Sequence, residues 1–171
     1  DRPQPSQKRF DTALWDALSR LDANRPVFVE SESKKIGALQ LPDALIDRMH
    51  SQGNCLRVDM PDAARVQLLL QEYGFFAADP DAFCRLLDGL VTLQGKERVT
   101  GWQAGARAGR WAEVFDDLMR MHYDPSYLRS MSRHYAGYDS ARVVALADGH
   151  ADTLRQAAQD LVGVTSATPS P

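Results

Sequence analysis

Apolar residues recur at helical spacing in several stretches of this chain, and prolines, glycines and asparagines separate these stretches. The first stretch follows Ser6, a candidate N-cap, and stops before Asn24-Arg25-Pro26. A shorter helix is predicted from Pro42 to Gly53, because proline suits the first helical turn and glycine the end of a helix. The apolar positions of the first helix are Phe10, Leu14, Leu18 and Leu21.

Three short apolar runs predict β-strands, at residues 27–29, 55–60 and 141–148. The first run, Val27 to Val29, has no polar alternation, which is typical of a strand covered on both faces. Strands that alternate with helices predict parallel pairing and an α/β fold. Three short strands make a thin sheet, so we expect part of the sheet to be missing from this chain.

Helical patterns fill the space between and after the last two strands. Residues 62–76 predict an amphipathic helix, and residues 79–135 predict a helical insert whose segments are separated by glycine or Asp-Pro. A final helix follows the third strand. We therefore predict one domain over residues 1–162 and a flexible tail over residues 163–171.

Composition indicates an ordinary soluble protein. The 171 residues are 44% hydrophobic and 25% charged, with a formal net charge of -3. This balance argues against a protein coated in positive charge for nucleic acid, and leaves room for a local basic patch. Cys55 and Cys84 lie in apolar runs and are predicted to be free structural thiols in a reducing, cytoplasmic compartment. No apolar run approaches the length of a membrane helix.

The segment VFVESESKKIG, residues 27–37, carries the strongest candidate chemistry. Glu30 and Glu32 follow the first predicted strand, and ligands of parallel sheets gather beyond the carboxyl ends of strands. Two carboxylates there suit a magnesium ion or a general base. Lys34 and Lys35 suit phosphate oxygens. The alternative is a solvated loop with a local ion pair, worth at most about 1 kcal/mol.

Further cations and aromatic residues are candidates for contacts with RNA or phosphate. Lys8 and Arg9 lie at a helix start, where the dipole disfavours cations and an anionic partner would favour them. Arg65 is a candidate phosphate contact or the partner of a local carboxylate. Trp102 and Trp111 lie among cations of the insert, where they stack on bases or, as is more frequent, fill a core.

The sequence HYDPSY, residues 122–127, offers a second aromatic site. Tyr123 and Tyr127 are candidates for stacking on a base or for lining an isoprenoid pocket, whereas Asp124 could simply cap the next helix. The histidines have no metal-ligand spacing, so we predict no zinc or other structural metal.

Several stretches together resemble one known family. QPSQKRFDTAL, RPVFVESESKKIGALQLP, HYDPSYLRS and a terminal strand and helix resemble, in this order and over nearly the whole chain, the C-terminal part of bacterial tRNA 2-selenouridine synthase. This family is also described as tRNA 2-thiouridine geranyl and selenium transferase. Its members carry a rhodanese-like domain with a catalytic cysteine and a P-loop domain.

The resemblance implies a transferase that replaces sulfur by selenium in 2-thiouridine at the tRNA wobble position. It implies an S-geranylated intermediate, with geranyl diphosphate and selenophosphate as co-substrates. On this interpretation residues 27–30 are a Walker-B-like strand with Glu30 as its acidic end. The chain has no G-x-x-x-x-G-K-[ST] segment and no rhodanese-type loop, so we expect a partial P-loop NTPase-like three-layer domain.

The combined sequence hypothesis assigns a role to each candidate. Glu30 and Glu32 are predicted catalytic, with Glu30 also a magnesium ligand; Lys34, Lys35 and Arg65 bind the diphosphate. The expected partners are tRNA, the remainder of the P-loop domain and the rhodanese-like domain, without membrane or DNA. The predicted RNA contacts are Lys8, Arg9, Tyr123 and Tyr127. The alternatives are a P-loop small-molecule kinase and a non-catalytic helical RNA-binding module.

Overall fold

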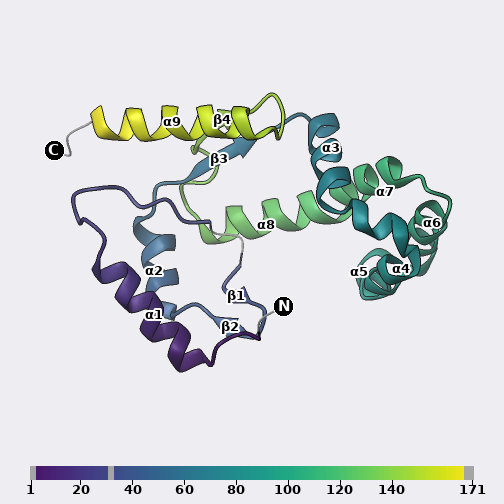
Figure 1. Ribbon diagram of the computed structural model, residues 1–171, viewed down its shortest axis with the longest axis horizontal. Helices are drawn as coiled ribbons and strands as arrows, with labels where there is room; N and C mark the ends of the chain where they lie inside the picture. Colours follow the sequence, from purple (N-terminus) through teal and green to yellow (C-terminus); the bar gives the residue numbers. More distant parts are fainter. Residues whose placement is uncertain (1–2, 31–32, 168–171) are drawn as a thin grey trace. The chain divides into compact units, whose positions relative to one another are not determined.

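The computed structural model describes residues 3–30 and 33–167, and divides into two compact units (Figure 1). Unit 1 comprises residues 1–56, 131–142 and 159–171, and unit 2 comprises residues 57–130 and 143–158. Helices α8 and α9 each contribute residues to both units. Because each unit has its own internal packing, the two are treated separately below.

Unit 1 contains the first helix, a small antiparallel hairpin and a second helix. The Ser6 hydroxyl accepts a hydrogen bond from the backbone N–H of Arg9, so the predicted N-cap is confirmed. The helix predicted from Pro42 to Gly53 is also confirmed. The elements are α1 (Gln7–Ser19), β1 (Lys35–Ile36), β2 (Leu39–Gln40) and α2 (Asp43–Gln52).

Aromatic stacking joins the end of α2 to the end of α8 within unit 1. The His50 ring stacks on His134 with centroids 5.4 Å apart, and meets the buried Tyr135 edge-on at 4.7 Å. Edge-to-face and offset contacts of this kind add to the stabilisation from burial alone. These histidines therefore have a packing role that their sequence spacing did not indicate.

Unit 2 contains two paired strands and most of the helices. The strands are β3 (Leu56–Asp59) and β4 (Arg142–Ala145). The helical elements are α3 (Asp62–Glu72), η1 (Gly74–Ala78), α4 (Pro80–Asp88), α5 (Val91–Gln94), α6 (Lys96–Arg107), α7 (Trp111–Leu118), η2 (Met119–Tyr123), α8 (Asp124–His134) and α9 (Ala151–Ala167).

Strands β3 and β4 form a small parallel sheet, as the alternation of strands and helices predicted. The backbone N–H of Leu146, just beyond β4, donates to the carbonyl of Asp59 at the end of β3, with 2.8 Å between the atoms. Both carboxyl ends therefore lie at the same edge. The last helix continues to Ala167, beyond residue 163 where the tail was expected to begin, and residues 168–171 lie outside the described part.

The predicted strand at Val27 to Val29 is wrong. These residues adopt no regular secondary structure, and their side chains are 50–52% exposed. A strand is stable only when neighbouring backbone groups complete its hydrogen bonds, and no strand among the described residues pairs with this segment. Glu30 consequently follows an extended apolar loop instead of a strand end.

The expected break at Asp124-Pro125 is also wrong. Helices α7 and α8 are joined without interruption by the π-helical turn η2, and Asp124 has helical dihedral angles (φ -59°, ψ -47°), so it is not an N-cap. Proline inside a helix lacks an N–H donor and clashes with the carbonyl four residues earlier. The wider π turn immediately before Pro125 relieves this conflict.

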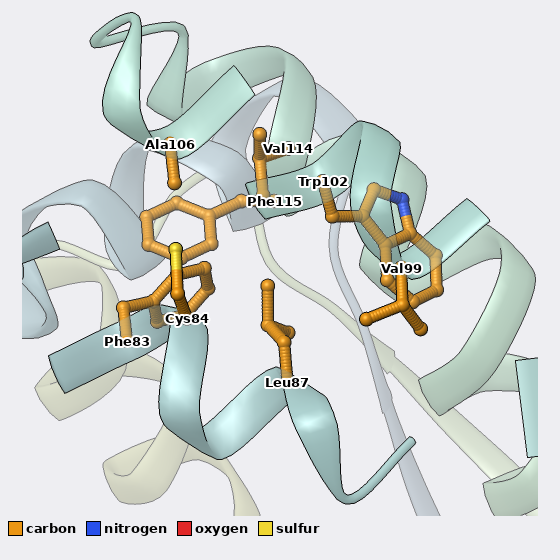
Figure 2. Close-up of a cluster of buried hydrophobic side chains, with 8 residues drawn as sticks. All are labelled: Phe83, Cys84, Leu87, Val99, Trp102, Ala106, Val114 and Phe115. Atoms are coloured by element: carbon orange, nitrogen blue, oxygen red, sulfur yellow. The ribbon is translucent and has the colours of Figure 1, made fainter. Parts of the chain in front are cut away.

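The main core of unit 2 lies between α4, α6 and α7. Figure 2 shows its buried side chains converging from these three helices. Trp102 is 4% exposed, and its indole N–H donates to the Asp117 carboxylate at 2.6 Å. The ring of Trp111 packs edge-on against Phe83 with centroids 5.3 Å apart. Trp102 is therefore a core residue, and Trp111 is half-buried and packs against this core.

Cys84 belongs to this core and Cys55 is half-buried, and both are free thiols. Burial raises the pKa of the Cys84 thiol above its ordinary value. Because the thiolate is the nucleophilic form, this environment disfavours covalent chemistry at Cys84. Its structural role, predicted from the apolar run, fits this environment.

Two adjacent leucines of α4 differ in burial, and substituting each of them tests which residues form the core. Leu87 is 4% exposed, whereas Leu86 is 64% exposed. We expect Leu87→Ala to lower the free energy of unfolding by about 2–5 kcal/mol, because it removes buried methyl groups and leaves a cavity. The matched control Leu86→Ala should change it by less than about 1 kcal/mol. Urea unfolding followed by circular dichroism measures both; equal losses would contradict the assigned core.

Candidate functional site

Two glutamine side chains hold the start of α1 on the β1–β2 hairpin. The Gln4 amide donates to the carbonyl of Ile36 at 2.7 Å and accepts from the N–H of Ala38 at 2.8 Å. The Gln7 amide donates to the carbonyl of Gln40 at 2.8 Å and accepts from the N–H of Gln40 at 3.0 Å. We call these four hydrogen bonds the glutamine clamp. Sequence reasoning considered only the cations of this segment and missed the glutamines between them.

The glutamine clamp brings together two backbone segments that carry predicted phosphate ligands. Lys8 and Arg9 directly follow Gln7, and Lys35 pairs with Gln40 in the hairpin register. We call Lys8, Arg9, Lys34 and Lys35 the cationic face. In the part of the chain that the structure describes, no ion pair involves Lys8, Arg9 or Lys35, whereas Lys34 binds Asp43 at 2.5 Å.

Gly37 makes the close contact between Gln4 and the hairpin possible. Its φ of +63° is in the left-handed region, which disfavours side chains, and a Cβ there would lie 2.6 Å from Oε1 of Gln4. The glycine that the sequence analysis placed after the two lysines is therefore required by the hairpin turn.

One of the two carboxylates of the predicted acidic site lies within the described residues. Glu30 is exposed and lies in unit 1 with Lys34 and Lys35, whereas Glu32 lies outside the described residues. Over residues 3–30 and 33–167, no three His, Cys, Asp or Glu side chains gather closely enough to hold a metal ion. No such group therefore includes Glu30 within these residues, and its role as a magnesium ligand stays a prediction.

Arg65 forms a bidentate ion pair within unit 2. Its guanidinium binds both carboxylate oxygens of Asp124, at 2.9 and 2.5 Å, and reaches Asp62 at 3.4 Å. The hydrogen bond to Asp124 raises the pKa of the Arg65 guanidinium, whereas burial lowers it. Arg65 is therefore held mainly by a carboxylate from a distant part of the sequence, and its role as a phosphate contact stays a prediction.

The two predicted tyrosines lie together on the helix that carries Asp124. Tyr123 and Tyr127 stack with ring centroids 5.7 Å apart, as residues four positions apart on one helix face can do. Tyr123 is 43% exposed and Tyr127 is half-buried. Their contact with a base or an isoprenoid stays a prediction.

A pocket that sequence reasoning missed lies beyond the carboxyl end of β4 in unit 2. It has a volume of about 280 Å³ and opens between α3 and the loop that leads into α9. Gly149 allows the loop to approach α3, because a Cβ at this position would lie 2.9 Å from Leu68 Cδ1. The lining residues are Ala63, Ala64, Gln67, Leu68, Gln71, Asp148, Gly149 and His150.

The loop at this pocket is ordered around the Asp148 carboxylate. It accepts hydrogen bonds from the Thr153 hydroxyl and from the backbone N–H of His150, which lies 2.9 Å away. Nδ1 of His150 lies 3.2 Å from the carboxylate. These interactions, led by the Thr153 hydrogen bond, lower the pKa of Asp148, so this wall of the pocket is negatively charged at neutral pH. The sequence signal was Asp-Gly-His directly after the third apolar run.

The ionised Asp148 makes a pH-dependent contribution to stability. A lowered pKa in the folded state stabilises the fold above the pKa of the unfolded chain, and this stabilisation is lost as the pH falls through the folded pKa. We expect Thr153→Val to raise the pKa of Asp148 toward its ordinary value and to reduce stability at pH 7 but not at the lowest pH at which the protein stays folded.

Carbon-13 NMR of the Asp148 carboxyl group and urea unfolding at several pH values measure these effects. Thr92→Val, in the exposed part of α5, is the matched control and should leave the titration unchanged. An unaltered Asp148 titration in Thr153→Val would contradict the assigned hydrogen bond.

Comparison with known proteins identifies relatives of the N-terminal half. Residues 1–84 match a family model described as the AAA domain of tRNA 2-selenouridine synthase. Proteins of this name are 35% identical over 105 residues in Alcanivorax borkumensis, 36% over 74 in Nitrosomonas europaea and 32% over 106 in Salmonella arizonae. The resemblance inferred from the sequence motifs is therefore confirmed.

The matched segments span only part of each protein. They cover 56%, 42% and 60% of this chain and 29%, 19% and 26% of the respective relatives. The resemblance of the remaining residues stays a prediction. No solved structure matches the chain. Within the described residues, no helix has the length and apolar character needed to cross a membrane.

Proposed function

Because residues 1–84 match the AAA domain of tRNA 2-selenouridine synthase, we propose that this chain is part of a cytoplasmic enzyme that modifies uridine at the tRNA wobble position. The observation that carries the proposal is this match, together with a cationic face inside the matched segment. The proposed fold context is a P-loop NTPase-like three-layer domain, of which the chain supplies the parallel strands and helices described above.

The proposed reaction exchanges sulfur for selenium in two displacements. The sulfur of 2-thiouridine forms a bond to C1 of geranyl diphosphate, and the diphosphate leaves with the electron pair of the broken C–O bond. The selenium atom of selenophosphate then attacks C2 of the base, and the geranylated sulfur leaves as the thiolate. Attack of water on phosphorus breaks the P–Se bond and releases phosphate, which leaves selenium on C2. Each displacement needs a binding site for an anion that carries or gains negative charge.

The cationic face supports such a site. Ammonium groups near a leaving diphosphate stabilise the charge that develops on its oxygens. Lys35 has no ion-pair partner within the described residues, and Lys34 is 48% exposed and paired with the exposed Asp43, so a diphosphate can compete with that carboxylate. In the proposal Glu30 and Glu32 act at the opposite end of the same segment, as base or as ligands of a diphosphate-bound magnesium ion.

The exposure of the small parallel sheet supports the proposal that a partner covers and completes it. Val58 of β3 is 60% exposed and Val143 of β4 is 44% exposed, although parallel sheets normally bury both faces. In the proposal the remainder of the P-loop domain covers this sheet and supplies the phosphate loop, and a rhodanese-like domain supplies the catalytic cysteine. The exposed apolar segment Val27 to Val29 is a further candidate for pairing with this partner.

Two other functions make different predictions. A P-loop small-molecule kinase would bind ATP tightly and transfer a phosphoryl group, and its activity would not require tRNA. A non-catalytic helical RNA-binding module would bind RNA without turnover. The burial of Trp102 weakens the second alternative, because it removes an indole that such a module would use for stacking on bases.

The RNA-binding role of the cationic face is tested by removing two of its charges. We expect Lys8→Gln/Arg9→Gln to weaken tRNA binding about tenfold and to reduce the slope of log K against log salt by about 1–2, because each phosphate contact releases counterions. Removing cations from a helix start slightly favours the helix, so folding should be preserved. Fluorescence anisotropy over a range of salt concentrations measures both quantities.

The control for this experiment lies on the same helix. Arg20 is the C-cap residue of α1, and its side chain is 75% exposed. At a rise of 1.5 Å per residue, it lies about 18 Å along the helix axis from Lys8. Arg20→Gln should leave the affinity and the salt slope unchanged. Equal effects of Arg20→Gln and Lys8→Gln/Arg9→Gln would rule out a localised phosphate contact.

The acidic residues are tested by turnover in the complete enzyme. We expect Glu30→Gln/Glu32→Gln to lower the rate of selenium incorporation at least a hundredfold, within the range for the loss of acid–base or charge-stabilising groups, while tRNA affinity stays within about twofold. Mass spectrometry of wobble uridines measures turnover. Glu72→Gln, at the end of α3, is the control for the loss of a carboxylate outside the proposed site. Undiminished turnover in the double variant would exclude the proposed acidic site.

A further inference from the structure

The pocket beside α3 has walls of two kinds. Gln67 and Gln71 lie one helical turn apart, so their carboxamides project from the same face of α3. Ala63, Ala64 and Leu68 supply an apolar surface next to them. Opposite these residues lies the loop from Asp148 to His150. The combination of an apolar surface and neighbouring amides can accommodate a ring that has donors and acceptors along its edge.

Size and charge narrow the class of ligand. A volume of about 280 Å³ is just below the roughly 300–1,000 Å³ of pockets for drug-sized ligands, so the space suits a single base or nucleoside. The Asp148 carboxylate at the pocket wall repels phosphate and diphosphate groups.

We propose that the pocket between α3 and the Asp148–His150 loop binds the extruded uracil base of the tRNA substrate. A glutamine carboxamide donates to O4 of the base and accepts from N3–H, as carboxamides read other bases through paired hydrogen bonds. Enzymes that act on a base within RNA take it out of the stack and read its edge in such a pocket. The inference rests on the proposed function and adds a base site in unit 2 to the phosphate contacts proposed for unit 1.

The experiment compares two RNAs and measures a ratio. Anticodon stem-loops carrying either uridine or an abasic residue at the wobble position are titrated into the 171-residue chain, and fluorescence anisotropy gives both dissociation constants. We expect the uridine stem-loop to bind about tenfold more tightly than the abasic one, the effect of one good paired contact. Gln67→Leu/Gln71→Leu should bring this ratio to about one, because leucine has a similar size and no hydrogen-bonding groups.

Control and second variants separate base binding from altered folding. Gln52→Leu, at the exposed end of α2, should keep the tenfold ratio. Ala63→Leu, which adds volume at the pocket wall and keeps both glutamines, should remove the ratio as the double glutamine variant does. Thermal unfolding of each variant verifies that the fold is intact.

Each other outcome overturns a defined part of the proposal. A ratio of one in the unaltered chain, or a tenfold ratio that survives both pocket variants, would overturn the base site while leaving tRNA binding intact. NMR could show that free uridine binds in the pocket while the wobble base does not affect stem-loop affinity. The pocket would then bind a free nucleoside, and the proposal that it binds a base of tRNA would be wrong. If neither stem-loop binds, the proposed function fails together with the base site.

Discussion

Helix α3 has to satisfy two different neighbours, and the organisation of unit 2 depends on this constraint. One face carries the buried Val66 and the Arg65 guanidinium, which meet α7 and the helix that follows it. The other face carries small and amide side chains toward the loop after β4. A 3.6-residue period places these two sets on opposite sides of one helix. The same element therefore fixes the ion pair and forms a wall of the pocket.

Unit 1 solves a smaller packing problem with backbone hydrogen bonds. The β1–β2 hairpin has only two residues per strand, too few to be stable alone in water. Gln4 and Gln7 complete its backbone hydrogen bonds from the start of α1. The same hydrogen bonds bring the backbone segment that carries Lys8 and Arg9 to the hairpin that carries Lys35. The local structure and the proposed binding of phosphate have the same physical basis.

Much of the helical content and two of the three strands could be predicted from local patterns. Ser6 and Pro42 marked helix starts correctly, and the runs around Val58 and Val143 became β3 and β4. The strand predicted at Val27 to Val29 is absent, because strand formation depends on a pairing partner that an apolar sequence alone does not specify. The helix break predicted at Asp124-Pro125 is also absent, because a π turn just before Pro125 accommodates the proline within a continuous helix.

The sequence by itself determined the resemblance to tRNA 2-selenouridine synthase, the starts of α1 and α2 and the candidate cations, since these depend on residue identity and short spacing. Only the tertiary structure decided that Arg65 binds Asp124, 59 positions away, that Trp102 is buried, and that Gln67 and His150 line one pocket. The physical reason is that these hydrogen bonds, this burial and this cavity depend on contacts between segments that are distant in sequence. Local periodicity contains no information about such contacts.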